Sequence, residues 1–231
     1  MNWIELPCRK ENDAYNDSCQ KEEMIMNEVY QSLLTPIIYQ WVATHTNAKK
    51  GRKSCSICFC NDNYHASIYF HKENVIELCI LDKDTQENLF YLHFQMKNMK
   101  MATENINAFF SYLQKDHSNE SGGQSYTTSV NENLKILLSC TSGLTTTYFA
   151  HLLENSLNQS HHHVIVDAIS YMELDNIQNE YDLIFLAPQI SYKYVELREK
   201  YGKKVFMIDS YDFATGNVEH VLDKLIKERE N

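Results

Sequence analysis

The sequence contains little glycine and proline, with 6 and 3 residues in a chain of 231. With 43% hydrophobic and 23% charged residues, it falls outside the collagen-like, low-complexity and disordered classes and is expected to fold. No apolar run approaches the roughly 18 residues that a transmembrane helix needs, so we expect no membrane span. The length allows one large domain or two small ones, and the patterns described below favour two.

Basic residues are also scarce. The chain has 21 Lys and Arg against 31 Asp and Glu, a net charge of −10, and the parts before and after Asn133 share the acidic excess equally. Contacts from Lys and Arg to phosphates provide most of the non-specific affinity for nucleic acids. We therefore expect no nucleic-acid partner and no adhesion to an anionic membrane surface.

The first ten residues, MNWIELPCRK, lack the basic stretch and apolar core of a secretory signal. The 7 cysteines are an odd number, and their spacing is not that of a disulfide framework. Free thiols are typical of a reducing compartment. We therefore predict a cytoplasmic bacterial protein with reduced cysteines.

One polar segment divides the chain. Residues 114–133, QKDHSNESGGQSYTTSVNEN, have almost no aliphatic side chains and are rich in Ser, Thr, Asn and Gly, as linkers are. This pattern predicts a module at 1–113, a linker at 114–133 and a second domain at 134–231. We expect the two folded parts to fold independently.

The part after the linker alternates short apolar runs with amphipathic stretches. Continuous hydrophobicity is typical of strands buried on both faces, and it predicts strands at Leu134–Ser139, Val164–Ile169, Asp182–Ala187 and Lys204–Ile208. Helical spacing of apolar residues is clear at Phe149–Leu157 and Val218–Ile226, and weaker at Tyr171–Asn179 and Tyr192–Lys200. We expect an α/β domain with an open parallel sheet, whose functional sites lie at the carboxyl ends of the strands.

The part before the linker has a different pattern. Residues Gln20–Thr44 predict a helix interrupted or kinked at Pro36. A last helix is predicted to begin after Thr103 as its N-cap. Between them, period-two hydrophobicity predicts four strands, at Ser54–Cys60, Tyr64–His71, Val75–Leu81 and Asn88–Met96. We expect an α+β domain with an antiparallel meander sheet, which would suit a sensory, docking or dimerisation module.

The segment most informative about function is KILLSCTSGLTTTYFAHLL, Lys135–Leu153. It predicts a buried strand, Cys140 at its end, and a Thr/Ser/Gly loop that opens directly into a helix. Backbone N–H groups of such a loop, with the positive end of the helix dipole, form an anion cradle, and a thiolate facing it can accept a phosphoryl group. A buried structural cysteine before an ordinary helix cap is the alternative.

A cysteine phosphatase is a weaker hypothesis for the same loop. Such an enzyme uses an arginine six positions after its nucleophile to clamp the phosphate and stabilise the transition state. That position is Thr146 here, and the loop has no arginine. A phosphocysteine that survives to be passed on therefore suits the sequence better than hydrolysis.

Residues 134 to about 226 resemble the IIB component of the bacterial sugar phosphotransferase system (PTS), lactose/cellobiose type. Leu144, Ala187 and Ser210 stand where that family usually has Met, Gly and Pro. The resemblance rests on the Cys140 loop and on two later segments, which are YDLIFLAPQISY (Tyr181–Tyr192) and VFMIDSYDFATGNVEHVLDKL (Val205–Leu225).

The resemblance implies a four-stranded open parallel sheet with flanking helices and strand order 2-1-3-4. It also implies a phosphotransferase without a cofactor, in which Cys140 takes a phosphoryl group from a phosphohistidine IIA partner and passes it to a sugar at a membrane IIC component. Hydrogen bonding to the loop backbone is an equal alternative for Gln189. The residues expected to bind the phosphoryl group are Thr141, Ser142, Gly143, Leu144, Thr145, Thr146, Thr147 and Gln189.

A regulatory role is the main alternative to transport. Nothing before the linker resembles the helical IIA or the membrane IIC component. The IIB-like domain could therefore act as a phosphorylation switch whose state is sensed by the N-terminal module.

Other polar residues admit metal or phosphate hypotheses that we weigh lower. Cys55, Cys58 and Cys60 are close in sequence, but on a strand Cys55 faces away from the other two, so we expect ordinary strand cysteines and no metal. The run His161–His163 is expected at a solvated strand start. Asp209 is expected to cap the following segment, because its carboxylate would repel a phosphoryl dianion.

Overall fold

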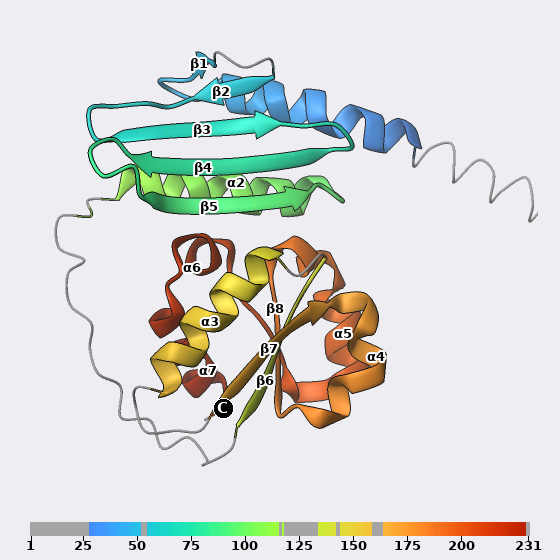
Figure 1. Cartoon of the computed structure of the whole chain (residues 1–231). Helices are drawn as coiled ribbons and strands as arrows, with labels where there is room; N and C mark the ends of the chain where they lie inside the picture. Colours follow the sequence, from blue (N-terminus) through green and yellow to red (C-terminus); the bar gives the residue numbers. More distant parts are fainter. Residues whose placement is uncertain are drawn as a thin grey trace, which may run out of the picture.

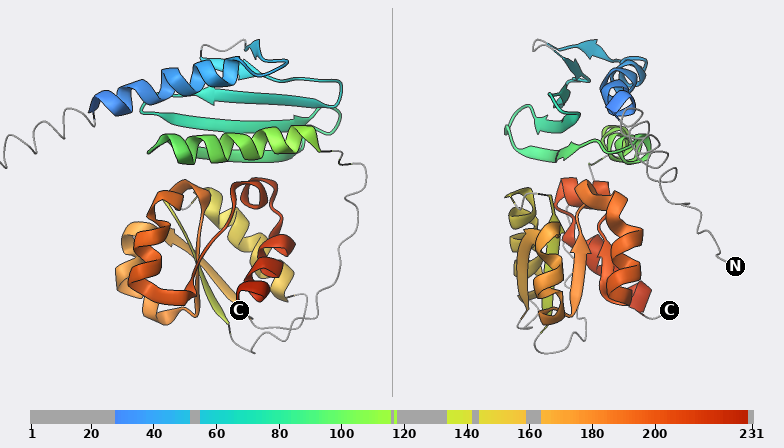
Figure 2. Two further views of the ribbon diagram at one scale, coloured as in Figure 1. Left: turned by 180° about the vertical axis from the view of Figure 1, so that it is seen from behind. Right: turned by 90° about the vertical axis from the view of Figure 1, so that its right-hand side faces the viewer.

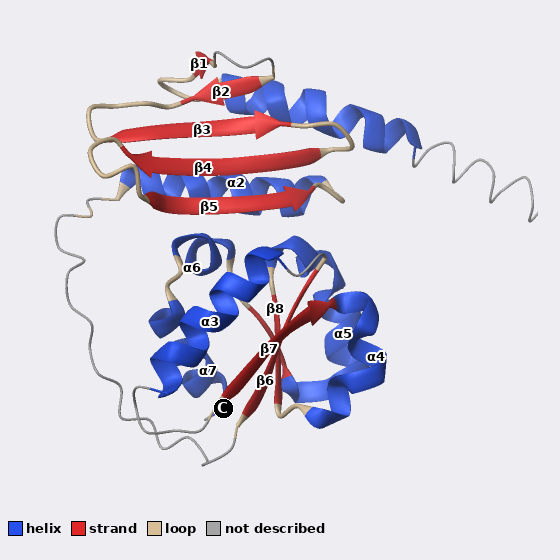
Figure 3. Ribbon diagram, in the orientation of Figure 1, coloured by secondary structure: helices blue, strands red, loops and turns tan. Residues whose placement is uncertain are grey.

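A computed structural model describes residues 28–51, 55–115, 117, 134–141, 144–158 and 164–229. The described chain forms an antiparallel sheet and then a parallel sheet, each with its own helices (Figure 1 and Figure 3). The predicted fold class, an α+β part followed by an α/β part, is confirmed.

The N-terminal sheet is an antiparallel meander with strand order β1-β2-β3-β4-β5. In β4, Ile76, Leu78 and Ile80 are fully buried while the residues between them are partly exposed, so the period-two pattern marks the two faces. That pattern predicts β2 to β5 but not β1, whose two lysines are exposed. The bounds are β1 Lys49–Lys50, β2 Ser56–Cys58, β3 Tyr64–Phe70, β4 Val75–Asp82 and β5 Asn88–Gln95.

Two helices cover one face of this sheet (Figure 2). The first is helical from 28 to 43, so of the predicted interruption or kink at Pro36 the interruption is wrong. Pro36 and Ser32 are both exposed, so water can satisfy the Ser32 carbonyl that the proline leaves without a helical donor. Its buried side is Leu34, Ile38 and Val42, spaced four residues apart.

The second helix, α2 (Met99–Gln114), begins earlier than its sequence predicts. Asn98 has extended backbone, and its side-chain oxygen accepts the Met101 N–H at 2.9 Å, which makes Asn98 the N-cap. The predicted cap, Thr103, lies inside the helix and donates to the Met99 carbonyl at 3.0 Å. The prediction was wrong because Asn98 and Thr103 are both good caps, and the first supports a longer helix.

The C-terminal sheet is parallel, with strand order β7-β6-β8-β9, which confirms the order 2-1-3-4. Alternate residues of the central strand enter different cores: Ile136 and Leu138 join one cluster, and Leu137 joins the other. Because both faces of this strand are buried, its sequence is continuously hydrophobic. The strands are β6 Lys135–Cys140, β7 Ile165–Ser170, β8 Leu183–Leu186 and β9 Val205–Met207.

Helices cover both faces of the parallel sheet (Figure 2). Helices α3 (Leu144–Asn158), α6 (Ser210–Thr215) and α7 (Val218–Arg229) pack on one face, and α4 (Leu174–Ile177) and α5 (Tyr194–Tyr201) on the other. The weaker predicted helix at Tyr171–Asn179 is split into α4 and two 3-10 turns. These two turns are η1 Tyr171–Glu173 and η2 Gln178–Glu180. Two further 3-10 turns are described, η3 Pro188–Lys193 after β8 and η4 Gly202–Lys204 before β9.

The two parts contact each other at one edge of each. Helix α2 and strand β5 lie against α6 and η3 (Figure 1). Because η3 follows β8 and α6 follows β9, the carboxyl ends of these strands and of their parallel neighbour β6 face the N-terminal part. The apolar cluster is continuous across this boundary, from Phe109 and Tyr112 of α2 to Phe213 of α6. The edge where functional sites of parallel sheets lie is therefore the edge that meets the N-terminal part.

Candidate active site

Cys140 is the last residue of β6, the strand between β7 and β8. The strand before it is fully buried at Ile136, Leu137 and Leu138, and this packing fixes the position of Cys140 in the centre of the sheet. The Cys140 side chain itself is only 1% exposed. Its thiol therefore lies at the carboxyl edge of the sheet but beneath the surface.

The segment after Cys140 leads directly into α3. Thr141 is exposed, and α3 begins at Leu144, so the positive end of the α3 helix dipole follows Cys140 by a few residues. Ser142 and Gly143, which the sequence places in the phosphoryl cradle, lie outside the described residues, as do the side chains of Leu144 and Thr145. The described backbone therefore places Cys140 and the start of α3 close together in the chain.

Two buried hydroxyls flank Cys140 in the sequence. Ser139 and Thr146 are 0% exposed, and the side-chain oxygen of each has no hydrogen-bond partner among the described residues. A buried hydroxyl without a partner costs about 1–3 kcal/mol. Thr147, one position further along α3, is exposed.

Gln189 follows the neighbouring strand β8 and is 3% exposed. It lies in η3, which begins with Pro188 and is held to β6 by the Ala187 N–H donating to the Ser139 carbonyl at 2.9 Å. Because β6 and β8 are parallel neighbours, Gln189 and Cys140 share one edge of the sheet. Both possible roles, binding an anion or supporting the loop, remain compatible with this position.

Ser170 is a polar residue at this edge that sequence reasoning missed. It is aligned with Cys140 in the β6–β7 register, and its hydroxyl lies 3.5 Å from the Thr141 carbonyl oxygen. The Ser170 hydroxyl oxygen also accepts the Met172 N–H at 3.4 Å, so Ser170 is the N-cap of η1. The available signal was a serine at the end of a predicted strand, but its pairing with Cys140 depends on the strand register.

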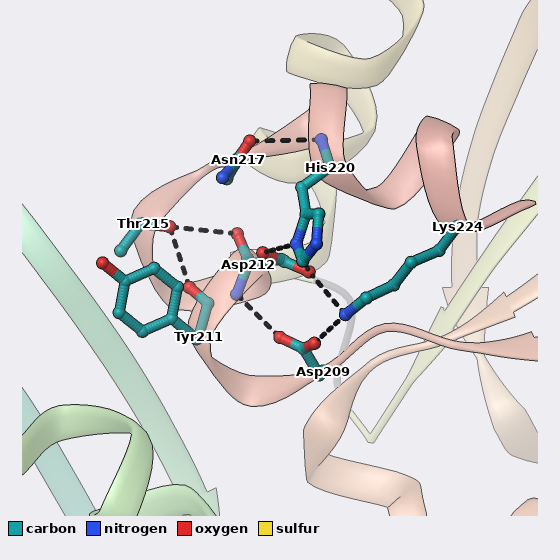
Figure 4. A network of polar contacts seen from close by, with 7 residues as sticks. All are labelled: Asp209, Tyr211, Asp212, Thr215, Asn217, His220 and Lys224. Carbon is teal, nitrogen blue, oxygen red and sulfur yellow. Dashed lines mark hydrogen bonds and ion pairs between the residues drawn. The ribbon is translucent and has the colours of Figure 1, made fainter. Parts of the chain in front are cut away.

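Asp209, at the end of β9, belongs to a polar network that joins α6 to α7 (Figure 4). Its carboxylate accepts the Asp212 N–H at 3.0 Å as the N-cap of α6, which confirms the predicted capping role. Lys224 forms ion pairs with Asp209 and, at 3.2 Å, with Asp212. His220 Nδ1 lies 2.7 Å from the other Asp212 carboxylate oxygen.

The pKa values of the two carboxyls in this network are shifted in opposite directions from their ordinary values. Burial works to raise the pKa of Asp209, but the Asp212 N–H and the Lys224 ammonium outweigh it and hold that pKa below its ordinary value. Burial raises the pKa of Asp212, and the nearby charge of Asp209 raises it further despite the hydrogen bond with His220. Ligand atoms of Asp209, Asp212 and His220 lie within 4.8 Å of one another, yet a metal there would have to displace Lys224 from both carboxylates.

The remaining candidates from the sequence lie apart from Cys140. Cys55 and Cys60 are exposed, and Cys58 Sγ lies 3.4 Å from the Ser67 hydroxyl on the adjacent strand. The run His161–His163 lies outside the described residues.

Comparison with known proteins identifies the C-terminal part. Residues 135–224 match the family described as PTS system, Lactose/Cellobiose specific IIB subunit. This confirms the family resemblance for this part of the chain, which we now term the IIB domain. The family match does not extend to the module before it. No curated protein matches the chain.

Two solved structures are similar to the IIB domain. One is the lactose-specific IIB component domain from Streptococcus pneumoniae, with 25% identity, a TM-score of 0.35 and coverage of 39% of this chain and 96% of that one. The other is the cellobiose-specific phosphotransferase IIB component from Borrelia burgdorferi, with 25% identity, a TM-score of 0.36 and coverage of 43% and 94%. In the ranges that the structure describes, no helix has both the length and the apolarity to cross a bilayer.

Proposed function

We propose that the chain is a cytoplasmic PTS phosphoryl carrier in which Cys140 is the covalent site. The observation that carries the proposal is the position of Cys140, at the end of the central parallel strand and just before the N-terminus of α3, in a domain that matches the lactose/cellobiose IIB family. The cradle is assigned to the backbone of Thr141–Thr147, with the Thr146 hydroxyl and Gln189 as further candidate ligands.

The proposed reaction consists of two transfers. In the first, the Cys140 sulfur attacks the phosphorus of a phosphohistidine on a IIA partner: a P–S bond forms, the P–N bond breaks, and the proton lost by the thiol balances the proton gained by the imidazole. In the second, a sugar hydroxyl bound to a membrane IIC component attacks the phosphorus. A P–O bond then forms, the P–S bond breaks, and the hydroxyl proton returns to sulfur.

The absence of an arginine in the Cys140 loop supports transfer over hydrolysis. The cradle stabilises negative charge through backbone N–H groups and hydroxyls, whereas a phosphatase adds a guanidinium clamp at the position of Thr146. A phosphocysteine without that clamp lasts longer, which is what a carrier requires.

The experiment is labelling by a lactose/cellobiose-type IIA protein that carries a radiolabelled phosphohistidine. We expect one label per chain, located by mass spectrometry on the peptide that contains Cys140, and none in Cys140→Ser. Label that persists in Cys140→Ser, or that resides on a histidine, would contradict the proposal. Cys60→Ser, which alters an exposed cysteine in the segment after β2, is the matched control and should label normally.

A phosphorylation sensor is the second candidate, and the burial of Cys140 favours it. A carrier must present its cysteine to two partners in turn, which suggests an exposed rim of Leu144, Tyr148, Ile190 and Tyr192. Tyr148 is 68% exposed, but Ile190 is fully buried and Cys140 is 1% exposed. Discharge of the label by membranes that contain IIC and a panel of disaccharides indicates the carrier; stable label with no discharge indicates the sensor.

A further inference from the structure

The N-terminal part presents α2 and β5 to the carboxyl edge of the IIB sheet (Figure 1 and Figure 2). This is the edge where β6 ends at Cys140 and where η3 and α6 begin. Any donor protein must bring its phosphohistidine into contact with the Cys140 sulfur from the same side, because the helices on the two faces of the sheet close the other approaches.

Specific contacts hold this interface together. The Ser210 hydroxyl of α6 donates to the Asn105 side-chain oxygen of α2 at 2.5 Å. Asn105 is 1% exposed, so a polar side chain of α2 is buried with its partner on the other part of the chain.

Tyr211 of α6 adds aromatic and charged contacts. Its ring centroid lies 6.1 Å from that of Tyr112 on α2, and the Lys115 ammonium lies 3.9 Å from the Tyr211 centroid. On the β5 side, Asn88 and Tyr91 line a cavity of about 280 Å³ together with Phe213 of α6. The contact is therefore polar and aromatic at its centre, with room at one side.

We infer that the α2 and β5 surface of residues 28–115 is an intramolecular binding surface for the carboxyl edge of the IIB domain, and that it competes with the phosphohistidine donor for this edge. The inference rests on the proposed function for its biological meaning. In structural terms, Cys140 is protected from partner proteins and reagents while α2 and β5 are docked on the IIB domain. The thiol becomes accessible when α2 and β5 separate from that domain.

Phosphorylation should act in the opposite direction. A phosphoryl group adds nearly two negative charges to a side chain that is 1% exposed, and an ionised group strongly prefers a solvated environment. The phosphorylated chain therefore favours the separated arrangement. Because linkage is reciprocal, separation of the two parts favours phosphorylation.

Alkylation of Cys140 tests the docking without any phosphoryl donor. The full chain is treated with N-ethylmaleimide, and modification of the Cys140 peptide is followed by mass spectrometry. If brief separation exposes the thiol, Tyr211→Ala and Ser210→Ala should each raise the rate by about fivefold or more, because each loosens the interface. The control, Ile165→Ala at the amino end of β7, should stay within about twofold of wild type.

The outcomes separate this inference from the proposed function. Folded interface variants that keep the wild-type alkylation rate would overturn the inference, since Cys140 would then be protected by its own domain. If circular dichroism shows that Tyr211→Ala does not fold, the milder Ser210→Ala decides by the same criterion. If the interface variants are alkylated faster but no donor phosphorylates the chain, the inferred docking surface is upheld and the proposed carrier function is refuted.

Discussion

Thr146→Val is the substitution that most directly connects the stability of this fold with its chemistry. The Thr146 hydroxyl is fully buried and has no hydrogen-bond partner among the described residues. Valine has almost the same shape and replaces the hydroxyl with a methyl group. The substitution therefore removes one buried polar group and changes little else in the first turn of α3.

The expected gain in stability follows from the cost of that hydroxyl. Burial of an unpaired hydroxyl costs about 1–3 kcal/mol, and part of this is recovered when a methyl group takes its place. We expect Thr146→Val to raise the free energy of unfolding by about 1 kcal/mol, or Tm by about 2–4 °C in a chain of this size. Urea unfolding followed by circular dichroism measures the change.

The control is the same substitution at a paired hydroxyl. Thr215 Oγ1 donates to the Tyr211 carbonyl at 2.8 Å, so Thr215→Val should lower the free energy of unfolding by about 0.5–1.5 kcal/mol. The two variants should therefore differ in sign. Equal losses of stability in both would refute the reasoning, because they would show that the Thr146 hydroxyl is paired in the folded protein.

Thr146→Val should lower the rate of phosphoryl labelling although it raises the free energy of unfolding. A hydrogen bond to a charged group contributes about 1.5–3 kcal/mol, which corresponds to a loss of roughly 10-fold to 100-fold in the rate of labelling by the IIA donor. A stabilised variant that labels at the wild-type rate would remove Thr146 from the phosphoryl-binding set while leaving Cys140 as the covalent site.

Two further substitutions test local electrostatics and capping. Lys224→Met should lower the free energy of unfolding by about 1–3 kcal/mol at pH 7, because Asp209 and Asp212 then repel each other and Asp212 is buried. This repulsion raises their pKa values in the folded state, so the difference from wild type should shrink as pH falls from about 7 to 4, measured by urea unfolding at each pH; a constant difference would contradict it. Asn98→Ala should cost about 0.5–2 kcal/mol by the same assay, and Thr103→Ala less; the reverse order would show that Asn98 is not the main cap.

The sequence determined the parts of this protein that follow from local patterns. Period-two hydrophobicity separated β2 to β5 from the continuous apolar runs of β6 to β9, because strands with one exposed face alternate and strands buried on both faces do not. The cysteine between a buried strand and a helix start located the candidate site. The surrounding residues indicated the resemblance to the lactose/cellobiose IIB family, whose model matches residues 135–224.

Local patterns did not predict the structure where two residues suit the same role or where solvent exposure relieves an unfavourable residue. Asn98 and Thr103 both suit a helix N-cap, and only packing of α2 selects the first. Pro36 predicts an interruption or a kink, and the helix is not interrupted, because Pro36 lies on the exposed side, where water can replace the missing donor.

Only the tertiary structure decided what surrounds Cys140. The alignment of Ser170 with Cys140 depends on the strand register, and the bond between Asn105 and Ser210 joins residues 105 positions apart. Sequence separation of this size leaves no periodic signal, because contacts between distant segments form only when both parts fold and dock. For the same reason, the sequence leaves open whether Cys140 is a reactive thiol or a buried strand-end cysteine. In the assembled chain the residue is 1% exposed, and it lies at the edge of the sheet that faces α2 and β5.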